Sequence, residues 1–104
     1  MSNKGFGLVV RFHLKPGAAE GFDQLVAETV PEIAKNEPGT LTYTVHGVEG
    51  EPNQRIFYEL YADRAAFDAH EEQPHTKRFL AARGEYLASY DVDFVEPIIS
   101  NTNV

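Results

Sequence analysis

Apolar and polar side chains alternate along four short segments of the chain, and the stretches between these segments follow a helical period. The alternating segments are residues 7–14, 41–46, 55–61 and 90–97. Alternation of this kind indicates strands, because successive side chains of a strand point to opposite faces. The apolar positions recur at helical spacing in residues 18–36, 63–72 and 74–87. The predicted order is therefore β-α-β-β-α-β, with the second helical region divided in two.

Proline, glycine and aspartate mark the ends of the predicted helices. Glu37-Pro38-Gly39 ends the first helix, because proline and glycine both interrupt helices. Asp63 suits the N-cap of the short second helix, and Pro74 suits the first position of the next. Pro31 lies inside the first helix and removes the hydrogen bond to Ala27, so we expect a kink or a short break there.

This order of elements is that of a ferredoxin-like α+β fold. Right-handed crossovers place both helical regions on one face of a four-stranded antiparallel sheet. The third strand carries apolar or aromatic side chains on both faces, and Val9 lies on the uncovered side of the first strand. We therefore expect a homodimer in which the uncovered sheet faces pack together. Residues 1–104 are predicted to form a single domain, with residues 98–104 as a polar tail.

Composition excludes several classes of partner. The formal net charge of -7 argues against nucleic acid and anionic membranes, which are bound through clustered lysine and arginine. Without cysteine there is no disulfide, thiol nucleophile or cysteine metal site, and a reducing compartment is mildly favoured. The sequence has neither the apolar core of a signal peptide near Met1 nor about 18 consecutive apolar residues, so we expect a cytoplasmic protein.

Glu59 is the first candidate for chemistry, because it shares its strand face with Phe57 and Tyr61. A carboxylate that is desolvated by aromatic neighbours has a raised pKa, which suits a general base. The alternative is that Glu59 forms an ordinary surface ion pair, since carboxylates are rarely buried without a partner.

Two histidines lie close to this strand in sequence. His70 follows Phe67 by three residues, and Phe79 follows His75 by four, so each imidazole flanks an aromatic side chain that faces the core. The break at Gln73-Pro74 brings the two helices together over the sheet. Together with Glu59, His70 and His75 are therefore our candidate catalytic residues. The alternative is that both histidines are solvated polar residues at helix ends.

A metal site is formally possible, because Glu59, His70 and His75 make a set of two histidines and one carboxylate. However, the histidines are five residues apart across a proline, and not four apart on one helix face. We therefore predict no metal. His13 and His46 are isolated strand histidines, although the central position of its strand could bring His13 near Glu59 and the substrate.

Aromatic residues are numerous enough to form the walls of a pocket, and core packing is the alternative role for them. The candidates are Tyr43, Phe57, Tyr58, Tyr61, Phe67 and Phe79. The motifs of dinucleotide binding, phosphoryl transfer, serine hydrolysis and zinc proteases are absent from the sequence.

Three runs of the sequence resemble the antibiotic-biosynthesis monooxygenase (ABM) family. These are EPGTLTYTV, YELYADRAAFDAH and EQPHTKRFLA. The resemblance implies a dimeric α+β barrel and the oxygenation of phenols, anthrones or quinols by dioxygen without flavin, haem or metal. It also implies that Glu59 or His70 is the base or its orienting partner, and that His75 donates a hydrogen bond to an oxygen-bearing intermediate.

The haem-degrading relatives of this family are a poorer match. They carry a tryptophan in the short helix and a haem-ligating histidine further on, whereas this chain has no tryptophan and has Leu80 where the ligand is expected. Two other functions remain open: a non-catalytic binding or stress-response module that holds an aromatic ligand, and a purely structural dimer with a filled core.

Overall fold

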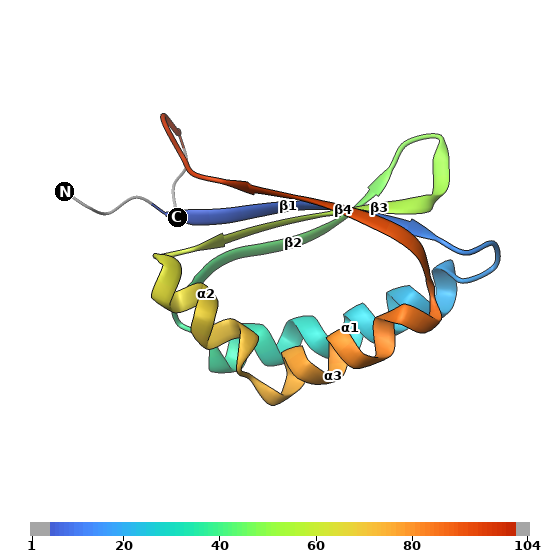
Figure 1. Cartoon of the computed structure of the whole chain (residues 1–104), viewed down its shortest axis with the longest axis horizontal. Coiled ribbons are helices and arrows are strands. Elements are labelled where there is room, and N and C mark those ends of the chain that lie inside the picture. The colour runs from blue at the N-terminus through green and yellow to red at the C-terminus, as the bar shows by residue number, and fades with distance from the viewer. Residues whose placement is uncertain (1–4, 102–104) are drawn as a thin grey trace.

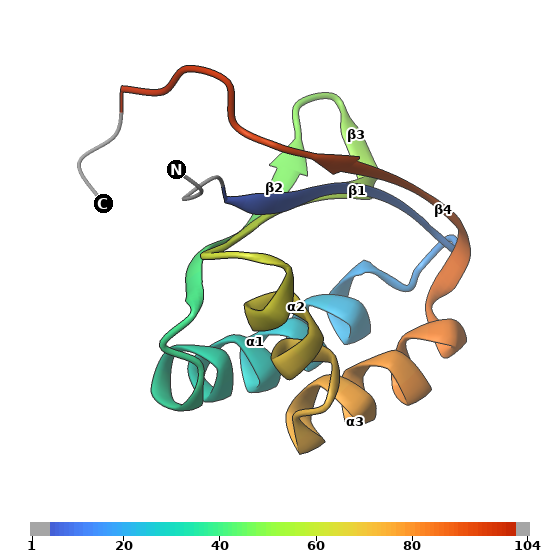
Figure 2. The ribbon, with the colours of Figure 1, turned by 60° about the vertical axis from the view of Figure 1, so that its left-hand side comes forward.

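The computed structural model describes residues 5–101, which form one antiparallel sheet with all helices on one of its faces (Figures 1 and 2). In chain order the elements are β1 (Phe6–Leu14), α1 (Ala19–Asn36), β2 (Thr40–Val48), β3 (Glu51–Tyr61), α2 (Arg64–Glu71), α3 (Pro74–Ala82), a 3-10 turn (Arg83–Glu85) and β4 (Leu87–Val95). The strands are arranged β2-β3-β1-β4. This is the ferredoxin-like arrangement that the sequence predicts.

The sheet register places one row of side chains, with one member from each strand, on the face that packs against the helices. Leu8 on β1 pairs with Glu59 on β3 and with Phe94 on β4, and Glu59 pairs with Tyr43 on β2. The next row contains Val10, which pairs with Phe57 and with Val92. A polar residue thus sits within the apolar face of the sheet.

The core lies between this sheet face and the helices. It consists of the helix-facing side chains of β1 together with aromatic and aliphatic residues from β3 and the helices. Its buried members are Leu8, Val10, Phe12, Leu14, Phe22, Leu25, Val26, Phe57, Tyr61, Phe67 and Phe79. α1 and α3 lie side by side beneath the sheet, and α2 covers one end (Figure 2).

Local capping largely follows the sequence. The Asp63 side chain accepts a hydrogen bond of 2.8 Å from the Ala66 backbone N–H, which confirms the predicted N-cap. Pro74 occupies the first turn of α3, as predicted. Pro31 does not interrupt α1, which runs unbroken through it. A single proline removes one hydrogen bond, and packing of the buried face of α1 holds the remaining turns.

The prediction that α3 continues to residue 87 was wrong. α3 ends at Ala82, and Leu87 already belongs to β4, where it pairs with Leu14. The Lys15 N–H also donates to the Tyr86 carbonyl, so pairing with β1 overrides the helical period of these apolar residues.

In the predicted tail beyond β4, Ile98 and Ile99 are 82% and 92% exposed. Residues 102–104 of the predicted tail lie outside the described residues. Within residues 5–101, no helix is both long and apolar enough to cross a membrane.

Candidate functional site

A cavity of about 220 Å³ lies between the helix-facing side of the sheet and the helices. Most of its lining is apolar or aromatic. The lining residues are Leu8, Val10, Phe12, Thr29, Tyr43, Phe57, Glu59, Phe67, His70, Glu71, Thr76, Phe79, Leu80, Arg83, Tyr90, Val92 and Phe94. Of the residues that the sequence nominates, the structure thus brings Glu59, His70 and four aromatic side chains together at one cavity.

Glu59 is held in the wall of this cavity by its position between two aromatic residues of β3. It is 6% exposed, and its Oε1 accepts a hydrogen bond of 2.6 Å from the hydroxyl of Tyr61. Burial raises the pKa of Glu59, and this effect outweighs the Tyr61 hydrogen bond and the nearby His70, which both lower it. Glu59 is therefore a carboxylate with increased affinity for a proton.

Tyr61 contributes through Glu59 and does not line the cavity. Its side chain is fully buried, and burial next to the Glu59 carboxylate raises the pKa of its hydroxyl. The hydroxyl therefore stays protonated and remains a donor to Glu59. Burial likewise raises the pKa of Tyr43, which lies in the cavity wall. Both tyrosines thus act as neutral hydroxyl groups.

His70 enters the cavity from α2, where it lies one turn after Phe67. Its ring stands 5.8 Å from the ring of Tyr43 and 5.2 Å from that of Tyr61, measured between centroids. Its Nδ1 lies 2.8 Å from Oε1 of Glu37. The imidazole is therefore fixed on one side by a carboxylate while it borders the cavity.

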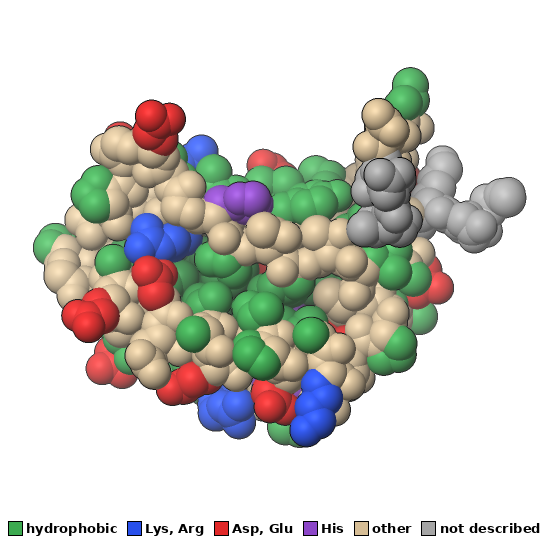
Figure 3. Space-filling view, turned by 180° about the vertical axis from the view of Figure 1, so that it is seen from behind, with side chains coloured by type: hydrophobic (Ala, Val, Ile, Leu, Met, Phe, Trp, Pro, Cys, Tyr) green, Lys and Arg blue, Asp and Glu red, His purple; other side chains and the backbone are tan. Residues whose placement is uncertain are grey.

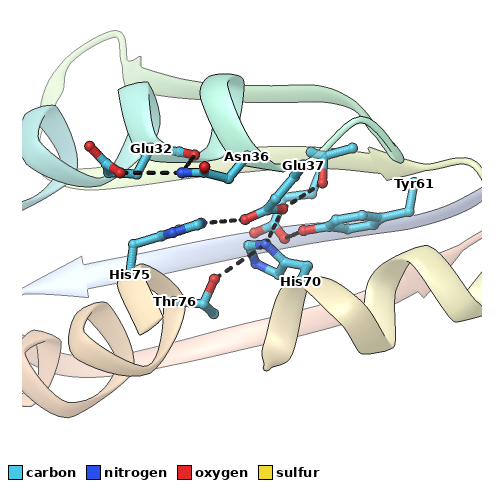
Figure 4. A network of polar contacts seen from close by, with 9 residues as sticks. Glu32, Asn36, Glu37, Tyr61, His70, His75 and Thr76 are labelled. Carbon is cyan, nitrogen blue, oxygen red and sulfur yellow. Dashed lines mark hydrogen bonds and ion pairs between the residues drawn. The ribbon is translucent and has the colours of Figure 1, made fainter. Parts of the chain in front are cut away.

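Glu37 is the functional residue that sequence reasoning missed. It caps the C-terminus of α1 and is 8% exposed, and its carboxylate contacts three side chains (Figure 4). Oε1 accepts a hydrogen bond of 2.7 Å from the hydroxyl of Thr40 and also contacts Nδ1 of His70. Oε2 is hydrogen-bonded to Nε2 of His75. The available signal was an acidic residue directly before the Pro-Gly helix stop, which we used as a helix end and in the family resemblance but did not assign to the site.

His75, the third predicted catalytic residue, belongs to this cluster and does not line the cavity. It is 4% exposed, and its ring points to Glu37 (Figure 4). It also borders a shallow depression on the outer surface, together with Glu32, Asn36 and Arg78. The helices do meet at the predicted break, but the break turns the two histidines toward a common carboxylate.

The expectation that His13 lies near Glu59 was wrong. His13 pairs with Gln54, and strand alternation puts it on the sheet face away from the helices, where its Nε2 lies 3.3 Å from Asp91. Tyr58 also points to that face, because it alternates with Glu59. Neither residue lines the cavity.

β4 and the end of α3 supply cavity residues that the sequence did not nominate. Tyr90, Val92 and Phe94 are 47%, 37% and 61% exposed, so they line the open side of the cavity. The Arg83 guanidinium lies 4.7 Å from the centroid of the Tyr90 ring. A second, wide depression lies at the opposite edge of the molecule, between β2 and α1, and is lined in part by Val26 and Val45. Figure 3 shows hydrophobic side chains gathered in a recess on this side.

Metal binding receives no geometric support from the residues that we considered. One ring nitrogen of each histidine contacts the Glu37 carboxylate, and His75 does not line the cavity that Glu59 lines. Within residues 5–101, no group of three or more histidine, aspartate or glutamate side chains is arranged to hold a metal ion.

Comparison with protein families identifies the fold and the family. Residues 5–82 match the family model described as antibiotic biosynthesis monooxygenase, and the chain belongs to this family. An uncharacterized protein of Synechocystis sp. PCC 6803 is 33% identical over 75 residues, which are 72% of this chain and 50% of that protein. The chain therefore spans about half the length of this curated relative.

Solved structures agree on the fold. A crystal structure from Bacteroides thetaiotaomicron superimposes with a TM-score of 0.88 at 22% identity, covering 96% of this chain and 95% of that one. One from Caulobacter crescentus gives a TM-score of 0.87 at 23% identity, covering 93% and 92%. Both proteins are provisionally described as antibiotic biosynthesis monooxygenases. At this identity the likeness establishes the fold alone.

Proposed function

We propose that this chain is a monooxygenase that binds a small hydroxylated aromatic molecule, of the phenol, quinol or anthrone type, and oxygenates it with dioxygen and no cofactor. The observation that carries the proposal is that the buried side chains of Glu59 and His70 lie on one largely aromatic cavity. Membership in the family supports the reaction class.

The cavity suits such a substrate by its composition. Phe57, Phe67 and Phe79 offer apolar walls to an aromatic ring, and Tyr43 offers a hydroxyl group to a polar substituent. A volume of about 220 Å³ has room for a small aromatic molecule, and its open side at β4 provides an entrance.

Proton removal is the step that the protein side chains assist. A base, Glu59 or His70, takes an acidic proton from the substrate, and the carbanion adds to dioxygen to form a carbon–oxygen bond. The peroxide takes up a proton, and loss of water with a second C–H proton leaves a carbonyl group. One oxygen atom stays in the product and the other leaves as water, so the substrate is oxidised as dioxygen is reduced.

Both candidate bases have features that support this role. The raised pKa of Glu59 makes its carboxylate a stronger base than an exposed one, while its hydrogen bond from Tyr61 fixes its orientation. Contact with Glu37 leaves the other ring nitrogen of His70 available as an acceptor. The aromatic walls restrict the substrate to a few orientations.

We further propose that the protein is a homodimer that covers the outer sheet face. That face carries Val9, Ile56, Tyr58 and Leu60, which are only partly buried in the single chain. Covering these side chains removes apolar surface from water.

Oxygen consumption with a panel of quinols and anthrones tests the proposal. We expect turnover by metal-free protein, a loss of about 100-fold or more in kcat for Glu59→Gln or His70→Gln, and retained ligand binding by both variants. Arg64→Gln serves as an exposed control. Ligand binding without oxygen consumption by the unsubstituted protein would instead identify the non-catalytic binding module.

A further inference from the structure

A continuous series of contacts leads from the cavity to the outer surface through three titratable side chains. His70 borders the cavity, and its Nδ1 contacts Oε1 of Glu37 at 2.8 Å. The other carboxylate oxygen of Glu37, Oε2, is bonded to Nε2 of His75. His75 borders the depression that contains Glu32 and Arg78 on the outside of the molecule. Figure 4 shows the two imidazoles on either side of the carboxylate.

The two ring nitrogens that do not touch Glu37 are the ends of this series. Among residues 5–101, neither Nε2 of His70 nor Nδ1 of His75 has a hydrogen-bond partner. Yet among residues 5–101 no completely buried side-chain nitrogen or oxygen lacks a partner. Both nitrogens therefore retain some accessible surface, although each histidine is about 95% buried. One belongs to a residue of the cavity wall and the other to a residue of the outer depression.

Resting on the function proposed above, we propose that His70, Glu37 and His75 form a proton relay that connects the cavity with solvent at the outer depression. His70 is the residue that meets the ligand. Glu37 and His75 are positioning and transfer residues, which act through His70. The cavity is also open to solvent beside β4, so the relay supplies a second route for protons, which begins at His70.

The protons balance as follows. The proposed relay starts with Glu37 as a carboxylate, His75 as an imidazolium and His70 as a neutral ring with its hydrogen on Nδ1. The ligand O–H or C–H bond breaks, and its proton binds Nε2 of His70. The Nδ1 proton of His70 passes to Oε1 of Glu37, and the Nδ1 proton of His75 leaves to water. The three side chains keep a total charge of zero, and the reverse transfers return a proton to the reaction intermediate.

Other polar groups and a second surface depression surround the relay. Thr40 donates to Glu37, Thr76 lies 3.4 Å from Nδ1 of His70, and Tyr61 donates to Glu59. A second surface depression touches both Glu37 and His70 directly. Water in that depression would bypass His75, so substitution of His75 decides whether the relay uses it.

Nitrogen-15 NMR of the histidine side chains in the ligand-free protein is the first test. We expect His70 to carry its hydrogen on Nδ1 and to keep Nε2 unprotonated, and His75 to be protonated on both nitrogens. Glu37→Gln should abolish the tautomer preference of His70, while the exposed control Glu72→Gln leaves it unchanged. A His70 with its hydrogen on Nε2 in the unsubstituted protein would overturn the relay.

Proton exchange of a bound chromophoric phenol is the second test. 4-Nitrophenol absorbs differently when ionised, so temperature-jump relaxation of its absorbance reports its exchange with solvent. His75→Gln keeps a donor for Glu37 but has no ring nitrogen to pass a proton. We expect it to slow relaxation at least tenfold and imidazole in the buffer to restore the rate. His46→Gln, an exposed histidine on β2, should not change it.

The results separate the relay from the proposed function. Relaxation at the unsubstituted rate in His75→Gln overturns the relay whatever the oxygenase assay gives. If 4-nitrophenol does not enter the cavity, the proposed substrate class loses its support, and the NMR experiment alone decides the relay. If both relay tests succeed without any oxygen consumption, the relay stands and the monooxygenase proposal falls.

Discussion

Removal of the Glu37 carboxylate should destabilise the protein more than any surface substitution. Glu37→Ala leaves two buried imidazoles without their acceptor and removes the acceptor of the Thr40 hydroxyl. Three side chains then lack their acceptor, and at about 1–3 kcal/mol for each unsatisfied group we expect a total loss of about 3–5 kcal/mol after partial relaxation. Domains of this size have a total stability of about 5–15 kcal/mol, so much of it is lost.

Thermal and urea unfolding measure this effect. With about 4–8 °C per kcal/mol for a domain of 60–100 residues, Tm of Glu37→Ala should fall by about 12–40 °C. Glu37→Gln keeps the shape and one acceptor oxygen, so we expect a smaller loss of about 1–3 kcal/mol. Glu72→Ala removes an exposed carboxylate paired with Lys77 and should stay within about 0.5 kcal/mol.

A loss below about 1 kcal/mol for Glu37→Ala would refute the reasoning. It would mean that water enters and satisfies both imidazoles, or that the cluster does not form. A double-mutant cycle of Glu37→Gln and His75→Gln separates these outcomes, since direct contact predicts a coupling energy of about 0.5–3 kcal/mol. A coupling near zero would show that the two side chains do not interact.

Three further predictions concern the cavity wall and the nearby helix. Tyr61→Phe removes the donor to Glu59 and should raise the pKa of Glu59 further and cost about 1–3 kcal/mol, as followed by carboxyl carbon-13 NMR and urea unfolding. The pKa of Glu59 is higher in the folded than in the unfolded chain, so ionisation of Glu59 destabilises the folded protein. As pH rises from the unfolded-chain pKa to the folded-chain pKa, the free energy of unfolding of Glu59→Gln should therefore increase relative to that of the unsubstituted protein. A difference between the two proteins that does not change with pH would contradict this. Asp63→Ala removes the hydrogen bond to Ala66 at the start of α2 and should cost about 1 kcal/mol in urea unfolding, whereas Asp63→Asn should cost much less.

The fold could be predicted from the sequence because each element carries its own local signal. Alternation defined the strands, and the Pro-Gly stop and the Asp63 cap defined helix ends. The prediction failed where two signals overlap. Tyr86 and Leu87 continue the helical period of α3, but only pairing with β1 assigns Leu87 to a strand. Leu14 and Leu87 are 73 positions apart in the sequence, so a local sequence pattern cannot predict that they pair.

The candidate site was predicted less completely, because its decisive contacts are tertiary. Glu59 and His70 were found through their aromatic neighbours in the sequence. Glu37 contacts His70 across 33 positions and His75 across 38, so no short window contains the cluster. His13 was misplaced for the opposite reason. Its central strand position was correct, but alternation already assigned it to the face away from the helices.

The break between α2 and α3 accounts for both the cavity and the cluster beside it. The two short helices on either side of this break both line the cavity that Glu59 also lines. The same break presents His70 from the end of one helix and His75 from the start of the next, so both reach one carboxylate. A substitution that straightens the break, such as Pro74→Ala, would therefore act on the cavity and the proton relay together.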